Sequence, residues 1–194
     1  LGPALNLGLT ICKYDLICRF DTDDISFSNR IEVSKKAFSE NPKLDIFGSS
    51  IIEFIESKKH FVRCTIKNVP LNDFAIKSAL SYRNSLNHPS IVFKKKSIEK
   101  LGNYENLKYF EDYHLWLKAK KNNLNFANHS TPLVLMRRIS NSERRQGIEY
   151  ARYENKFFRV AKKQKLINAS SNIFFLLRIL SRLIPSKCQF IYYF

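Results

Sequence analysis

The sequence predicts an α/β fold of stacked layers, and two observations support this prediction. Short apolar stretches that fit β-strands alternate along the chain with segments that fit amphipathic helices. The 194 residues are also 44% apolar, which is enough to form the core of one globular domain. The alternation indicates helices layered against a sheet, but it does not give the order of the strands.

The first expected strand covers residues 14–20 and stops at an acidic cluster, as a buried strand ends at a polar loop. A helix is expected after it, with Ser28 or Asn29 as its N-cap and Pro42 beyond its end. One face of that helix carries Ile31, Lys35 and Phe38.

A second strand is expected over residues 44–55. Gly48 lies inside it, and a glycine within a strand indicates a bulge or the close approach of another part of the chain. A helix from Pro70 through Leu80 follows, and a loop then leads into a strand at 90–93.

The second half of the chain continues the alternation. A short helix at 97–101 is closed by Gly102, a longer helix spans 111–121, and a strand covers roughly 125–136. From about residue 143 onward the chain reads as helical and very basic. We therefore expect one domain over residues 1–142 and a basic helical tail over residues 143–194.

The formal net charge of +16 is large for this length and predicts attraction to a polyanion. Charge alone leaves nucleic acid, an anionic bilayer and a phosphorylated substrate open. The four cysteines have no spacing typical of a zinc site, and disulfide frameworks are typical of shorter secreted chains. Reduced thiols in a cytosolic protein are therefore expected.

The strongest chemical signal is the acidic run that ends the first expected strand, Arg19-Phe20-Asp21-Thr22-Asp23-Asp24. Three carboxylates so close together repel one another unless a cation lies between them. Mg²⁺ and Mn²⁺ prefer oxygen ligands and commonly use one or two carboxylates together with substrate phosphates. A solvated loop whose aspartates cap a helix explains the same run about equally well.

A second acidic pair, Glu111 and Asp112, opens the helix expected at 111–121. Carboxylates in a first turn complement the helix dipole, so taken alone this pair is better explained by a structural role. Taken alone, His88 fits a buried, hydrogen-bonded histidine. Taken alone, Arg137 fits a solvated basic face.

In their order along the chain, these motifs resemble glycosyltransferase family 2, in the branch that builds bacterial surface polysaccharides and lipopolysaccharide. The resemblance covers roughly residues 2–140. It rests on the segments Asn6-x-Gly8-Leu9, Arg19-Phe20-Asp21-Thr22-Asp23-Asp24-Ile25-Ser26, Asn41-Pro42, Asp45-Ile46-Phe47-Gly48-Ser49, His88-Pro89-Ser90, Gly102-Asn103-Tyr104 and Glu111-Asp112-Tyr113-His114-Leu115-Trp116.

The resemblance implies a GT-A fold, a Rossmann-like sheet that binds a nucleoside-diphosphate sugar at the carboxyl ends of its strands. Members of the family begin with a strand, a helix and a strand that have no counterpart here, on the order of 70 residues. We therefore expect an N-terminally truncated GT-A domain, and whether this fragment is active by itself is open.

Residue roles follow from the same resemblance. Asp21 and Asp23 match the family's DxD motif, which supports the ribose and a Mn²⁺ or Mg²⁺ ion, with Asp23 as the more direct ligand. Asp112 matches the catalytic base of the ED motif. The expected donor-binding residues are Asn6, Arg19, Asp21 and Asp24. Contacts with the acceptor or the diphosphate are expected from Glu111, His88 and Arg137.

The implied reaction is an inverting sugar transfer in surface polysaccharide biosynthesis. Such a transfer needs a base that takes the proton of the acceptor hydroxyl, and a cation that neutralises the departing diphosphate. The expected partners are a nucleoside-diphosphate sugar, with a UDP-sugar favoured, and a saccharide or lipid-linked acceptor. Nucleic acid is not an expected partner.

Residues 173–184 are apolar but too few to span a bilayer. Arg178 and Arg182 lie one turn apart beside a wide apolar surface, which is typical of a helix at a membrane interface. We therefore expect a cytoplasmic protein, peripheral at the anionic inner face of the cell membrane. A helix packed on the domain is the alternative.

Two other classes of function stay open. A basic nucleic-acid-binding module fits the charge, although no recognised nucleic-acid signature accompanies it. A phosphotransferase or phosphatase of the haloacid-dehalogenase type also places a DxD motif after an apolar strand. Here Ile25 follows Asp24, so the hydroxyl expected in that class is out of place.

Overall fold

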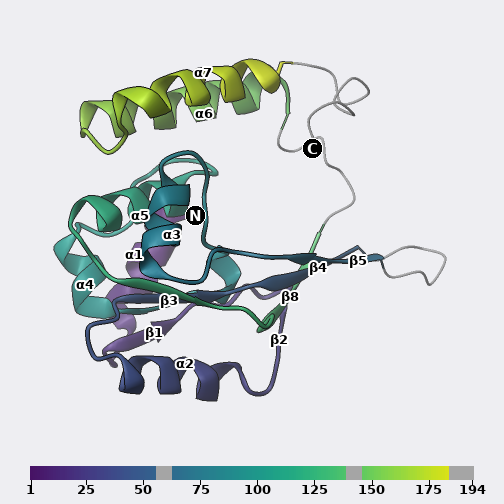
Figure 1. Ribbon diagram of the computed structural model, residues 1–194, viewed down its shortest axis with the longest axis vertical. Coiled ribbons are helices and arrows are strands. Elements are labelled where there is room, and N and C mark those ends of the chain that lie inside the picture. Colours follow the sequence, from purple (N-terminus) through teal and green to yellow (C-terminus); the bar gives the residue numbers. More distant parts are fainter. Residues whose placement is uncertain (56–62, 139–145, 184–194) are drawn as a thin grey trace.

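The computed structural model describes residues 1–55, 63–138 and 146–183, and it shows an α/β arrangement of layers (Figure 1). The α/β class expected from the sequence is therefore confirmed. Two four-stranded mixed sheets form the centre, and helices lie on both sides of them. None of the helices in the described ranges combines the length and the apolar character that a bilayer crossing requires.

The first sheet has the order β1-β6-β3-β7 and places the chemically interesting segments at one edge. Strand β6 runs antiparallel to β1 and to β3, whereas β3 and β7 are parallel. The carboxyl ends of β1, β3 and β7 therefore share one edge with the start of β6. The bounds are β1 Leu16–Cys18, β3 Ile46–Ser49, β6 Val92–Lys94 and β7 Phe126–His129.

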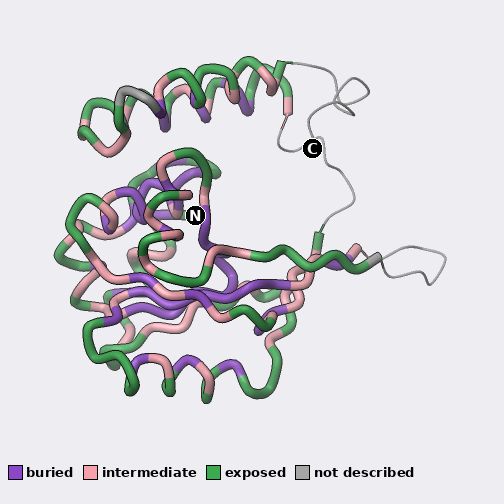
Figure 2. Tube along the Cα trace, viewed as in Figure 1, coloured by how far each residue is buried: buried purple, intermediate pink, exposed green. Residues whose placement is uncertain are grey.

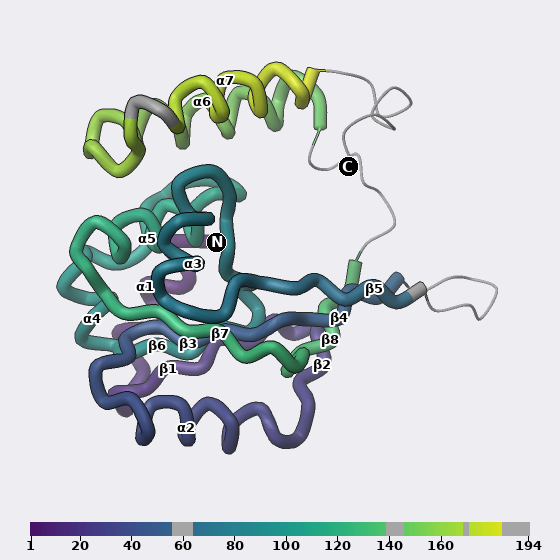
Figure 3. Tube along the Cα trace, in the orientation of Figure 1, coloured from purple at the N-terminus to yellow at the C-terminus, as the bar shows by residue number. Residues whose placement is uncertain are grey.

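The second sheet has the order β2-β8-β4-β5 and extends away from the first (Figure 3). Strand β8 is antiparallel to β2 and parallel to β4, and β5 pairs antiparallel with β4. The bounds are β2 Ile25–Ser26, β4 Ile51–Ile55, β5 Arg63–Lys67 and β8 Val134–Arg137.

The single strands expected at 44–55 and 125–136 are each divided in two, which corrects the sequence expectation. In both cases the first part lies in one sheet and the second part in the other. Ser50 marks the division: its N–H donates to the His129 carbonyl (3.0 Å), and its carbonyl accepts from the Leu133 N–H (3.3 Å). The two segments, β3 with β4 and β7 with β8, thus pass side by side from the first sheet into the second. Apolar patterning alone does not predict this division.

Gly48 confirms the close approach expected of it. A Cβ atom at this position would lie 2.4 Å from Oδ1 of Asn128 and 3.0 Å from Cδ1 of Ile91. Asn128 stands opposite Gly48 in the parallel pairing of β3 with β7. Because Gly48 has no side chain, the Asn128 amide can pack against the backbone of β3 at this position.

Helices cover both faces of the first sheet. Helix α2 (Arg30–Glu40) lies on one side, and a second group lies on the other: α1 (Gly2–Ile11), α3 (Asp73–Leu80), α4 (Lys95–Lys100) and α5 (Glu111–Lys121) (Figure 1). Beyond this group lies a further layer made of α6 (Gly147–Lys163) and α7 (Ala169–Ser181). A short 3₁₀ turn, η1 (His88–Ser90), leads into β6.

The sequence places Ile31, Lys35 and Phe38 on one face of α2, but the face that is buried in the structure is a different one. The buried residues are Arg30, Ser34 and Phe38, whereas Ile31 is 46% exposed. The reason is Arg30, whose guanidinium donates to Ser26 Oγ (2.8 Å) and to the Arg19 carbonyl (2.6 Å) and turns that side of the helix inward.

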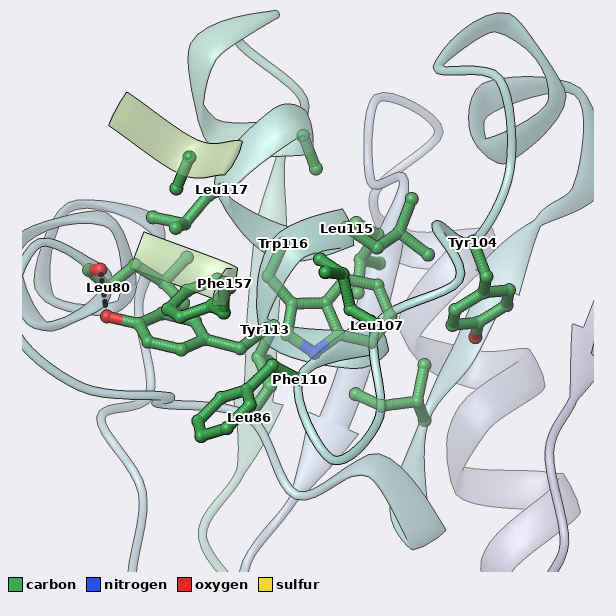
Figure 4. Close-up of a cluster of buried hydrophobic side chains, with 14 of the residues drawn as sticks. Leu80, Leu86, Tyr104, Leu107, Phe110, Tyr113, Leu115, Trp116, Leu117 and Phe157 are labelled. Carbon is green, nitrogen blue, oxygen red and sulfur yellow. Dashed lines mark hydrogen bonds between the residues drawn. The ribbon is translucent and has the colours of Figure 1, made fainter. Parts of the chain in front are cut away.

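The main core joins α5 to the outer helices through aromatic rings (Figure 4). Phe110 stacks on Phe157 of α6 with ring centroids 5.0 Å apart, and Phe175 of α7 lies 6.1 Å from Tyr113. The Tyr113 hydroxyl donates to the Leu80 carbonyl (2.8 Å), which ties α5 to the end of α3. Figure 2 shows buried residues on the sides of α6 and α7 that face this core.

Candidate functional site

The acidic cluster lies at the sheet edge where the sequence predicts chemistry. It follows β1, and the Arg19 N–H donates to the Ile91 carbonyl (3.0 Å), which extends the pairing of β1 with β6. Because η1 enters β6 from the same edge, His88 and the acidic loop are brought to one end of the sheet. Ser49, the last residue of β3, ends there as well.

The acidic loop is held from both sides. On one side the Arg19 guanidinium forms two hydrogen bonds with the Asp21 carboxylate. On the other side Arg137, at the end of β8, donates from its N–H to Asp24 Oδ1 (2.9 Å) and from Nε to the Asp23 carbonyl (3.2 Å). Arg137 is therefore a brace for the loop.

The three carboxylates of the loop have different surroundings. Asp21 is paired with Arg19, and Asp23 is exposed. Asp24 is partly buried, and burial, opposed by the Arg137 N–H, raises its pKa above the usual range. Within the described part of the chain, its Oδ2 atom is buried and has no hydrogen-bond partner.

This set of oxygens fits a hard divalent cation only in company with a ligand. Among the described residues, no group of three or more His, Cys, Asp and Glu side chains is arranged to hold a metal. An exposed carboxylate at Asp23 and an unpaired oxygen at Asp24 are suited to Mg²⁺ or Mn²⁺ when phosphate oxygens supply the remaining ligands.

Asp112 lies in a pocket beside this edge. It is the second residue of α5 and lines a cavity of about 250 Å³. Asn84 Nδ2 donates to its Oδ2 atom (2.7 Å), and the Tyr113 N–H donates to Oδ1 (2.6 Å), so the carboxylate is fixed in place. Other residues around the cavity are Asn84, His88, Tyr109, Arg178 and Arg182.

Glu111 is placed differently from its neighbour. It is only 5% exposed, and burial, together with the charge of Asp112, raises its pKa. A Cβ atom added at Gly2 of α1 would lie 3.6 Å from the Glu111 Cβ, so this side chain packs near α1. Glu111 is not one of the residues that line the cavity of Asp112.

His88 combines the two interpretations left open by the sequence. It is 8% exposed and lines the pocket, and its Nε2 shares a hydrogen bond with the Tyr104 hydroxyl (3.1 Å). Burial, and to a lesser extent the Arg19 charge, lowers the pKa of His88 well below its usual value. The imidazole is therefore neutral at physiological pH.

Asn6 makes a structural contact. Its amide donates to the Tyr104 carbonyl (2.8 Å) and accepts from the Tyr104 N–H (2.9 Å), which joins α1 to the turn after α4. Its expected part in donor binding stays a prediction.

The structure thus brings the predicted residues into two neighbouring groups. Asp112 and His88 share the pocket, whereas Arg19, Arg137 and the acidic loop form the second group. The Arg19 charge links them, because it adds to the lowering of the His88 pKa after the larger effect of burial. None of the three aspartates of the loop lines the pocket.

Sequence reasoning missed several pocket residues. Asn84 lies in a loop without a motif, and nothing local indicates that its amide holds Asp112. Tyr109 has a left-handed backbone (φ 70°), which is rare for an aromatic residue and marks a constrained position at the pocket wall. Arg178 and Arg182 were expected to flank a membrane helix, but they point inward instead.

Comparisons with known proteins identify the family. No family model matches the chain. The amylovoran biosynthesis glycosyltransferase AmsE of Erwinia amylovora is 33% identical over 99% of this chain and 72% of its own length. The chain belongs to the glycosyltransferases. An uncharacterized glycosyltransferase of Haemophilus influenzae is 35% identical over 96% of the chain and 69% of its own length.

One further relative and one solved structure are also similar to the chain. The relative is UDP-Gal:alpha-D-GlcNAc-diphosphoundecaprenol beta-1,3-galactosyltransferase of Escherichia coli. It is 37% identical to the chain described here, and the match covers 90% of this chain and 65% of the E. coli enzyme. The crystal structure of S. aureus TarS 1-349 has a TM-score of 0.55 at 14% identity, and this glycosyltransferase covers half of that chain. The second comparison supports the fold alone.

Proposed function

We propose that this glycosyltransferase is a GT-A enzyme of family 2 that transfers a sugar, with inversion, from a nucleoside-diphosphate donor to a saccharide or lipid-linked acceptor. The process it serves is surface polysaccharide biosynthesis, as suggested by the names of its Erwinia relative and of an O-antigen biosynthesis glycosyltransferase of E. coli. The relatives favour this function over a nucleic-acid-binding module and over a DxD phosphotransferase. The observation that carries the mechanism is the position of the Asp112 carboxylate in its pocket.

Asp112 is the proposed catalytic base. Asn84 and the Tyr113 N–H hold its two oxygens at 2.7 and 2.6 Å, so the carboxylate is presented in one orientation. A carboxylate held in this way can act as a general base that takes the proton of an acceptor hydroxyl entering the pocket. As that proton leaves, the acceptor oxygen attacks the anomeric carbon, and the nucleoside diphosphate departs.

The acidic loop is the proposed donor site. Arg19 and Arg137 hold the loop at the sheet edge, and Asp23 and Asp24 offer oxygens to a Mn²⁺ or Mg²⁺ ion. When bound, the ion supplies positive charge to the departing diphosphate. A UDP-sugar is the proposed donor, because the E. coli relative is named for UDP-Gal.

An anionic membrane surface is the proposed partner, with the protein at the cytoplasmic face. Four apolar residues of α7 are more than half exposed: Ile173 (68%), Leu176 (51%), Leu177 (60%) and Leu180 (58%). Exposed lysines at positions 162, 163 and 165 stand at the turn that leads into α7. An apolar stripe with basic neighbours suits the interface of a bilayer that carries a lipid-linked acceptor.

The test is sugar transfer by the intact protein from a panel of UDP-sugars to saccharides linked through diphosphate to a lipid. Asp112→Asn is expected to lower kcat by about 10²–10⁴-fold, because general-base catalysis is lost. UDP affinity in the presence of Mn²⁺, measured by calorimetry, should be unchanged. Full activity of Asp112→Asn would refute its role as the base.

Asp23→Ala tests the donor site in the same assay. It should remove both turnover and the response to Mn²⁺. The control is Asp15→Asn, because the Asp15 side chain is 81% exposed and its ion pair with Lys96 is 3.9 Å long. Undiminished transfer in excess chelator would contradict the proposed metal dependence.

A further inference from the structure

Helix α7 and the residue that follows it contribute two arginines to the pocket that contains Asp112. Arg178 and Arg182 both line this pocket, and both donate from Nε to the carboxylate of Glu154 in α6. The Arg182 contact is 3.0 Å long, and the Glu154 side chain is completely buried. One carboxylate thus faces two guanidinium groups at this part of the pocket wall, and the rest of the lining includes Lys67, Glu53 and Asp112.

The two guanidinium groups are fixed by aromatic rings as well as by Glu154. The Arg182 guanidinium lies 5.2 Å from the centre of the Tyr150 ring, and that of Arg178 lies 5.1 Å from the Phe175 ring. Each arginine meets Glu154 through Nε, and Nη1 of Arg178 also donates to the Tyr82 carbonyl (3.3 Å). The side chains of Arg178 and Arg182 retain 19% and 26% exposure.

We infer that Arg178 and Arg182 form a binding site for the diphosphate group of the acceptor. The inference rests on the proposed function. A guanidinium presents several N–H donors in a planar fork that matches phosphate oxygens, and a guanidinium already held in place loses little entropy when it binds. Glu154 and the rings supply that preorganisation here.

Position favours the acceptor over the donor as the source of the diphosphate. The acceptor hydroxyl must reach Asp112, so a phosphate attached to the acceptor sugar enters the same pocket. The acidic loop proposed for the donor lies outside this pocket. The exposed apolar side of α7, with Leu177 and Leu180, belongs to the helix that contains Arg178 and is followed by Arg182, and it suits the lipid beyond the diphosphate.

The experiment compares two acceptors that share one sugar. One acceptor carries the sugar on a lipid diphosphate, and the other carries it on an uncharged alkyl chain. The test variant is Arg182→Gln combined with Glu154→Gln, so that no buried carboxylate is left with a single partner. Arg182→Lys keeps the charge but not the fork. Arg159→Gln, on the exposed side of α6, is the matched control.

We expect the double variant to raise KM for the diphosphate acceptor about tenfold or more, because a charged hydrogen-bonded contact is lost. Transfer to the uncharged acceptor, UDP affinity and the melting temperature should change little, and Arg182→Lys should give an intermediate loss. An equal loss on both acceptors, or no loss, would overturn the inference. Weakened UDP binding would assign the arginines to the donor and also overturn it.

A binding measurement separates this inference from the proposed function. Hexyl diphosphate, which carries no sugar, should bind the wild-type protein and the Arg159→Gln control, and it should bind the double variant about tenfold more weakly. This result supports the arginine site even if no sugar transfer is found with any UDP-sugar. Equal binding to wild type and double variant overturns the site even if transfer is observed.

Discussion

At the scale of single residues, buried polar groups hold the pocket together. His88 and Tyr104 share a hydrogen bond, the His88 ring lies edge-on to the Trp116 ring, and Asn6 fixes the backbone of Tyr104. Asn84 plays the same part for Asp112. Buried polar groups are costly unless they are paired, so each of these contacts favours a single arrangement of the site.

The buried His88 should make stability depend on pH. Its pKa in the folded protein lies well below the ordinary value of 6.5, because burial disfavours the charged form. The unfolded chain therefore binds a proton that the folded chain does not, and stability is lost as the pH falls below about 6.5, by up to about 1.4 kcal/mol per pH unit.

His88→Gln should reduce this loss, as measured by urea unfolding between pH 7.5 and 5. Part of the slope will remain, because burial also lowers the pKa of His114. The same substitution at the more exposed His129 is the control. An unchanged slope in His88→Gln would mean that the imidazole takes up its proton within the folded protein.

At the scale of elements, the strands that cross between the sheets position the site. Strands β3 and β7 run side by side, and their continuations β4 and β8 carry the pairing into the second sheet. Strand β8 ends at Arg137, which braces the acidic loop. The crossing therefore links the sheet edge at Ser49 to the orientation of the aspartates.

Gly48→Ala should destabilise the protein by about 1–3 kcal/mol, because the new methyl group would overpack the space between the two strands. The Cβ atom would lie 2.4 Å from Asn128 Oδ1, and the amide has to move. The measurement is the free energy of unfolding in urea.

Gly8→Ala is the matched control for this change. No heavy atom lies within 4 Å of a Cβ added at Gly8, which is inside α1. That substitution should leave the stability unchanged or raise it by up to about 1 kcal/mol, because alanine favours a helix. Equal effects of the two substitutions would show that β3 and β7 adjust freely at this point.

At the scale of the whole molecule, the outer helices divide two tasks between their faces. The inner side of α7 buries Phe175 and turns Arg178 and Arg182 toward the pocket, while its outer side leaves apolar residues exposed (Figure 2). Helix α7 is therefore packed on the domain, which was the alternative to a helix at a membrane interface. Its outer side is nevertheless apolar and exposed, so it can still contact a membrane surface. The net charge of +16 acts over the whole protein.

Vesicle binding tests this surface. The protein should sediment with vesicles that contain anionic lipid, and added salt should weaken the binding because it screens the basic residues. Leu177→Glu should reduce the binding several-fold. Ile31→Glu, on α2 at the far side of the sheet, is the control because that side chain is 46% exposed. Equal binding by both variants would show that α7 does not make the contact.

The sequence was sufficient for the parts that local chemistry specifies. The helix over Glu111–Lys121 begins and ends where expected, because acidic residues at its start and lysines at its end match the helix dipole. The α/β class follows from alternating patterns of short period. The resemblance to glycosyltransferases rests on motifs of a few adjacent residues each, and the relatives confirm it at that level.

Only the tertiary structure decided which distant residues meet. Asn84 binds Asp112 from 28 positions away, and Arg182 reaches Glu154 from the same distance along the chain. The basic pattern of the tail was compatible with a solvated or membrane-facing position for Arg178 and Arg182. Burial of Glu154 turned them inward, because a buried carboxylate requires a partner. Local periodicity fixes the face of an element but not its neighbour, so the pocket is a product of packing.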